Sequence, residues 1–138
     1  MSRLRKIVVA VFAIVLLGAG VLFLKDLRWK AAQRRRDTEY TKILSGYERN
    51  LRPGMSRAKV ADYLHSNNVN YSLIGWGGDA LAYAIKIGED PSNVWYCDHW
   101  TVYVGLEFYP STAERAEVDP MPTDTLRELH IRKLGTCL

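Results

Sequence analysis

The chain has 138 residues, and its formal charge of +4 hides an uneven distribution of basic and acidic side chains. Residues 1–36 hold nine Lys/Arg against one acid, whereas the remainder holds ten Lys/Arg against 14 Asp/Glu. Beside an apolar segment, this length leaves room for one folded domain. The acidic balance of that domain argues against nucleic-acid binding, because an acidic surface repels phosphate.

Residues 7–24, IVVAVFAIVLLGAGVLFL, form an apolar run without charge or proline. About 18 residues are just enough for a helix to cross the hydrocarbon core of a bilayer. A cleaved signal peptide is the alternative, with small residues at 18–20, but the apolar run continues beyond them. The pattern favours a retained signal anchor, a single transmembrane helix. Residues 1–6 are then a short basic tail and 25–36 a basic juxtamembrane linker.

The charges flanking this span leave its orientation open. Lys and Arg are more numerous after the span than before it, which predicts a cytoplasmic domain by the positive-inside rule. Against this, the tail before the span carries three cations of its own and would have to cross instead. No cysteine lies near the span, which excludes a lipoprotein anchor.

Two helices are expected at the start of the soluble domain, 37–138. Asp37-Thr38 predicts the first helix start. An apolar face at helical spacing follows, formed by Tyr40, Ile43, Leu44 and Tyr47. Pro53-Gly54 ends this helix. Ser56 predicts the N-cap of a second helix over about 57–66.

From Asn67 onward the apolar residues alternate with polar ones, which predicts strands. The expected strands cover about 69–73, 81–87, 100–108 and 128–132, with a turn at 88–93 and a polar loop at 110–123. The expected fold class is α+β. Two N-terminal helices pack on one face of an antiparallel sheet of about four strands, preceded by the transmembrane helix.

Cys97 and Cys137 have two interpretations. Cys97 and His99 would share a strand face, which suits a small redox or hydrolytic enzyme, but no further catalytic group and no zinc-ligand spacing accompanies them. The competing interpretation is a Cys97–Cys137 disulfide, which needs an oxidising compartment. We expect no enzyme, no metal, no cofactor and no small-molecule substrate.

Three aromatic residues are candidates for binding a partner. Trp76 lies in a Gly-rich turn and would be an exposed anchor; alternatively its ring folds over the sheet edge. Tyr103 and Tyr109 lie on the strand face opposite the core and would form a partly open aromatic surface. Alternatively, they pack beneath the 110–123 loop.

The stretch LRPGMSRAKVADYL, residues 51–64, resembles the signature that opens the second helix of small exported α+β domains. These are the SmpA/OmlA (BamE-type) lipoproteins and the β-lactamase-inhibitor-like proteins. The matching positions are Gly54, Met55, Ser56, Val60 and Leu64. The resemblance covers about residues 38–134 and implies this fold. The lipobox cysteine is missing, and residues 65–68 replace the usual Gly-Lys-Pro-like sequence, so outer-membrane assembly is not implied.

The sequence thus predicts a single-pass membrane protein whose soluble domain lies on the extracytoplasmic, periplasmic side. Its expected function is non-enzymatic: a membrane-tethered module that binds another envelope or membrane protein. An envelope-associated or inhibitor-like role is a version of this function. The alternatives are the enzyme that uses Cys97 and His99, and a membrane adaptor that faces the cytoplasm.

Overall fold

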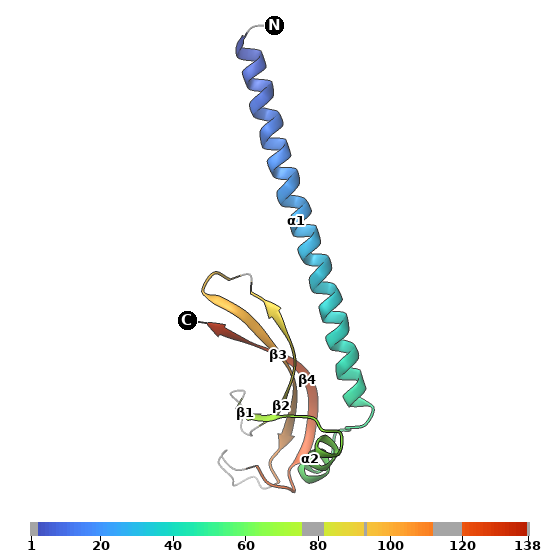
Figure 1. Cartoon of the computed structure of the whole chain (residues 1–138). Helices are drawn as coiled ribbons and strands as arrows, with labels where there is room; N and C mark the ends of the chain where they lie inside the picture. The colour runs from blue at the N-terminus through green and yellow to red at the C-terminus, as the bar shows by residue number, and fades with distance from the viewer. Residues whose placement is uncertain (1–2, 76–81, 93, 112–119, 138) are drawn as a thin grey trace. The chain divides into compact units, whose positions relative to one another are not determined.

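A computed structural model describes residues 3–75, 82–92, 94–111 and 120–137. In chain order its elements are α1 (Arg3–Glu48), α2 (Arg57–Ser66), β1 (Ser72–Ile74), β2 (Ala82–Pro91), β3 (Cys97–Tyr109) and β4 (Thr125–Cys137) (Figure 1). The four strands form one antiparallel sheet in the order β1-β2-β3-β4. The predicted α+β class and the four-stranded antiparallel sheet are confirmed. Two compact units divide the chain, residues 1–39 and 40–138.

The apolar part of α1 lies in the first unit. Every side chain described between Arg5 and Leu24 is exposed, although residues 7–24 are apolar. By length and composition, this helix could cross a membrane. Beyond the apolar run, Lys30 Nζ lies 2.7 Å from a carboxylate oxygen of Asp26, one turn away, an ion pair that supports the helix.

The predicted helix start at Asp37-Thr38 is wrong, because α1 runs without a break from the apolar segment to Glu48. The Thr38 hydroxyl does not cap a helix; it donates to the Arg34 carbonyl at 2.8 Å, one turn earlier. Residues 25–36, expected as a linker, contain no Pro or Gly and are rich in Ala, Lys, Arg and Gln, which favour helix. The apolar helix and the first expected soluble helix are therefore one element.

The break between α1 and α2 follows the sequence prediction. Gly54 has φ +89°, in the left-handed region that glycine adopts without strain. Ser56 is the N-cap of α2, and its hydroxyl oxygen accepts the Lys59 N–H at 3.5 Å. The helix that follows covers Arg57–Ser66, as predicted.

The same segment pairs with the start of β4. The Gly54 N–H donates to the Leu126 carbonyl, and the Leu126 N–H donates to the Met55 carbonyl, both at 2.7 Å. The Arg57 N–H, in the first turn of α2, donates to the Asp124 carbonyl at 2.7 Å. A first-turn amide has no acceptor within its own helix, so this pairing satisfies it and fixes where α2 begins.

One buried cluster joins α2, the turn before it and three strands. Its members are Leu51, Val60, Leu64, Tyr83, Ile85, Val104, Leu106, Phe108 and Leu126. The β3 residues of this cluster have even numbers and face one side, as the alternation predicts. Burial of their apolar surface contributes about 25 cal/mol per Å².

β2 extends through the turn that the sequence predicts at 88–93, as far as Pro91. The β2–β3 register shifts between Lys86 and Gly88, a bulge that redirects the strand. Gly88 lies against Tyr40, near the end of α1, where an added Cβ would be 2.8 Å from the Tyr40 ring. The Tyr40 hydroxyl donates to Asp90 Oδ1 at 3.1 Å. The predicted turn therefore comes later than expected, after Pro91, and residues 88–91 belong to β2, where Gly88 and Asp90 contact Tyr40.

Arg57 and Asp124 form a buried ion pair at the start of α2. They are 2% and 3% exposed, and Arg57 Nε lies 3.3 Å from Asp124 Oδ2. The Arg57 guanidinium lies 4.0 Å from the Phe108 ring centroid. Burial alone would raise the pKa of Asp124. The backbone N–H groups of Met121 and Ser111 and the charge of Arg57 outweigh it and hold this pKa below its usual value.

The substitution Asp124→Asn is expected to lower the free energy of unfolding by about 3–5 kcal/mol, because it leaves the Arg57 charge buried without its carboxylate. The folded-state pKa of Asp124 lies below the unfolded value of about 3.9. The wild-type stabilisation is therefore present above about pH 4 and lost as the pH falls through the folded pKa. Urea titrations of the full chain in detergent, followed by near-UV circular dichroism from pH 7 to pH 2, measure both effects.

Asp62→Asn is the matched control, since it removes an exposed acid from α2. Its unfolding free energy is expected to stay within about 0.5 kcal/mol of the wild type. If wild type and Asp124→Asn lost stability in parallel below pH 4, the Asp124 carboxylate would not be the group responsible.

Candidate functional site

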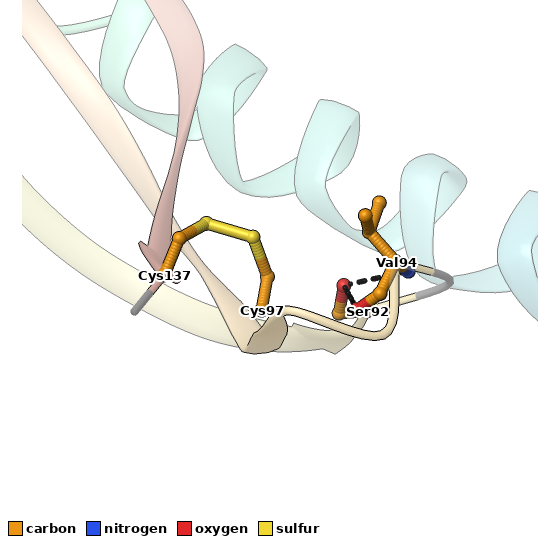
Figure 2. The surroundings of a disulfide bond; sticks show 4 residues. All are labelled: Ser92, Val94, Cys97 and Cys137. Atoms are coloured by element: carbon orange, nitrogen blue, oxygen red, sulfur yellow. Dashed lines mark hydrogen bonds between the residues drawn. A yellow bond between two sulfur atoms is a disulfide. The ribbon is translucent and has the colours of Figure 1, made fainter.

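A disulfide joins the first residue of β3 to the last residue of β4. The sulfur atoms of Cys97 and Cys137 are bonded (Figure 2), and the two residues face each other in the β3–β4 pairing. Cys97 is buried, whereas Cys137 is exposed. The predicted disulfide is therefore present. While it is intact, Cys97 carries no thiolate that could act as a nucleophile.

The turn between β2 and β3 lies next to this disulfide. The Ser92 hydroxyl oxygen accepts the Val94 N–H at 3.0 Å and donates to the Val94 carbonyl at 3.1 Å (Figure 2). The Cys97 N–H donates to the Val94 carbonyl at 3.1 Å. Between Val94 and Cys97, Trp95 is 95% exposed and Tyr96 is 48% exposed. Their rings meet edge to face, with centroids 5.8 Å apart. The disulfide end of the sheet thus presents two aromatic side chains to the outside.

Trp95 is not among the interaction residues that the sequence predicts. A signal for it exists, because residues 91–96, PSNVWY, end in two aromatic residues without any charge. Alternation patterns locate strands, and this run lies between two of them, so periodicity does not mark it. Trp76, the predicted anchor, lies outside the described residues.

The other two predicted interaction residues lie on β3. Tyr103 is half-buried, and Tyr109 is 54% exposed. The Arg127 guanidinium lies 5.4 Å from the centroid of the Tyr109 ring. Glu107 stands between the two tyrosines on the same strand face, since alternate residues share a face. The surface is therefore mixed, aromatic and charged, and its role in binding stays a prediction.

Glu107 belongs to a charged cluster on β3 and β4. Arg132 Nη2 donates to Glu107 Oε1 at 3.0 Å, and Arg132 Nε donates to His130 Nε2 at 2.6 Å. Ligand atoms of Glu107, Glu128 and His130 all lie within 4.8 Å of one another, close enough to hold a metal ion. A metal bound through His130 Nε2 would need the lone pair that accepts the Arg132 bond. Glu107, His130 and Arg132 therefore form a network of ion pairs and hydrogen bonds on the sheet.

A hollow of about 370 Å³ lies beside α2. Its described lining residues are Arg57, Ala58, Ala61, Asp62, His65, Tyr71, Leu73, Tyr83, Pro120 and Pro122. Asp124 balances the charge of Arg57. Burial, followed by the nearby Tyr83 phenol, raises the pKa of Tyr71 above its usual value. The described lining contains no Ser, Thr, Cys or Lys, and its side chains of types used in covalent catalysis are Asp62, His65, Tyr71 and Tyr83.

The positions that carry the family resemblance have structural roles. Gly54 turns the chain, Met55 pairs through its backbone with β4, and Ser56 caps α2. Val60 and Leu64 are fully buried. Comparison with protein-family models, curated proteins and solved structures gives no match. The resemblance to SmpA/OmlA lipoproteins and β-lactamase-inhibitor-like proteins therefore stays a prediction.

Removing the disulfide with Cys97→Ala and Cys137→Ala together is expected to lower the free energy of unfolding. The bond joins residues 40 apart in sequence, so loop entropy predicts a loss of about 4 kcal/mol. Urea titration of the full chain in detergent measures the loss. The single variant Cys97→Ala is the control: it breaks the same bond and should lose about as much as the double variant. If the losses of Cys97→Ala and Cys137→Ala, measured singly, summed to the loss of the double variant, the effect would come from packing of each sulfur and not from the bond.

Proposed function

We propose that this chain is a membrane-tethered, non-enzymatic module that binds another envelope or membrane protein on the extracytoplasmic side. The observation that carries the proposal is the exposed apolar run of α1, residues 7–24, in a chain whose second unit has a buried core of its own. Insertion of this run into a bilayer removes its apolar surface from water. Lys25, Arg28 and Trp29 follow the run, in the position where basic and indole side chains favour the interface.

The disulfide supports the extracytoplasmic side. Disulfides persist in oxidising compartments such as the periplasm and are rare where thiols are kept reduced. The excess of Lys and Arg after the apolar run supports the opposite orientation, a module that faces the cytoplasm. We give the disulfide more weight, because the basic tail before the run competes with the charges after it.

Binding in this proposal takes place on the sheet. Val60 and Leu64 of α2 belong to the same buried cluster as the even-numbered residues of β3. Tyr103 and Tyr109 lie on the opposite face of β3, beside the network of Glu107, His130 and Arg132. Tyrosine and arginine are both enriched in protein interfaces. The tether restricts the module to the membrane surface, which raises its effective concentration for neighbouring membrane proteins.

Thiol labelling in intact cells tests the orientation. With a membrane-impermeant maleimide, the wild type should be labelled only after reduction, because both cysteines are outside and bonded. Cys97→Ser is the matched control, since it frees the exposed Cys137 and should be labelled without reductant. Labelling of both proteins only after the cells are broken would place the second unit in the cytoplasm and contradict the extracytoplasmic proposal.

Site-specific photo-cross-linking tests the binding face. With benzoylphenylalanine in place of Tyr109, illumination of intact membranes should yield a discrete protein adduct. The same photoreactive residue in place of Lys59, an exposed position on α2, should not yield this adduct. Equal adducts from both positions, or none from either, would contradict a binding face around Tyr109.

A further inference from the structure

We infer that the β2–β3 turn is a second membrane contact, in which Trp95 and Tyr96 insert into the headgroup region of the same bilayer. This inference rests on the membrane tether of the proposed function. It depends neither on the side of the membrane nor on a protein partner, because a bilayer leaflet is present on either side.

The side chains of Trp95 and Tyr96 are exposed. Trp95 is almost fully exposed, and the ring contact it makes is the edge-to-face contact with Tyr96. Trp95 and Tyr96 lie in the turn between β2 and β3. An exposed aromatic pair in a turn can enter a soft, planar interface that needs no shaped pocket to receive it.

The chemistry of the turn favours lipid. Indole and phenol rings have an apolar body with a polar group, and both are enriched where headgroups meet acyl chains. Residues 91–96 contain no Lys, Arg, Asp or Glu, so the tip can enter this region without removing a charge from water. The nearest charged residue on the β3 side is Asp98, three positions beyond Trp95.

The turn is also held in shape before it meets a membrane. The Cys97–Cys137 bond closes its β3 side, and Ser92 and Cys97 bond to the backbone of Val94 within it. A pre-ordered loop loses little conformational entropy on binding, so more of the free energy of the aromatic contact contributes to affinity.

The chain length limits how far the second unit can lie from the bilayer. Residues 25–39 separate the apolar run from the second unit, and 15 residues span at most about 50 Å even when fully extended. The second contact is therefore intramolecular and needs only a weak intrinsic affinity to be populated.

Fluorescence quenching by brominated lipid tests the inference. The full chain is reconstituted into phosphatidylcholine vesicles with or without bromine on the acyl chains, and the Trp95 signal is the wild type minus Trp95→Phe. We expect brominated lipid to reduce this difference at least twofold. The Trp29 signal is obtained in the same way, as the wild type minus Trp29→Phe, and reports whether the apolar run is inserted, because Trp76 and Trp100 remain in each of these proteins.

A matched control moves the indole to the other end of β3. Tyr109→Trp in the Trp95→Phe background should add fluorescence that brominated lipid does not quench. If the Trp95 difference is unquenched while Trp29 is quenched, the inference is overturned and the tether stands. If no variant is quenched, the tether fails as well.

Photo-cross-linking separates lipid from protein at the turn. With benzoylphenylalanine in place of Trp95 in intact membranes, mass spectrometry should detect adducts of one lipid molecule. A discrete protein adduct at this position would overturn the inference and assign the turn to a protein partner.

Discussion

The pairing of β3 with β4 is the constraint on which the rest of the second unit depends. Two 13-residue strands face each other from Cys97–Cys137 at one end to Tyr109–Thr125 at the other. The disulfide closes the first end. At the second end, Leu126 near the start of β4 makes backbone hydrogen bonds with Gly54 and Met55, and these position α2. Both the aromatic turn and the start of α2 therefore take their positions from one ladder.

Two buried carboxylates specify how the helices meet this sheet. Asp124 pairs with Arg57 at the start of α2. Asp90 accepts from the Tyr40 hydroxyl near the end of α1 and lies 2.6 Å from Lys133 Nζ of β4. Desolvation offsets much of the attraction in such pairs, so their main effect is on position. A helix that shifted would leave a buried charge behind, and this penalises alternative placements more than it strengthens the native one.

The two candidate contact regions occupy opposite ends of β3. At about 3.3 Å per residue, the strand separates Cys97 from Tyr109 by about 40 Å. A protein bound around Tyr109 and a bilayer at the Trp95 turn would therefore not compete for the same surface. Together, a transmembrane anchor and a second interfacial contact would restrict the orientation of the sheet, which in turn decides which neighbouring proteins can reach its Tyr109 end.

Local signals in the sequence were enough to locate the apolar segment, the Ser56 cap of α2 and the alternation of β3, because each depends on neighbouring residues. The number of strands also followed from these signals. The continuity of α1 has a local basis too, in the helix-favouring composition of residues 25–36. Only the tertiary structure decided that β2 passes through residues 88–91 and that Arg57 meets Asp124. These outcomes depend on which distant residues become neighbours, and alternation fixes a residue's face but not its partner. For the same reason, the sequence left open whether the two cysteines serve chemistry or form a disulfide, since only strand register brings Cys97 opposite Cys137. The exposure of Trp95 also has no signal in periodicity, because its turn lies outside the paired strands.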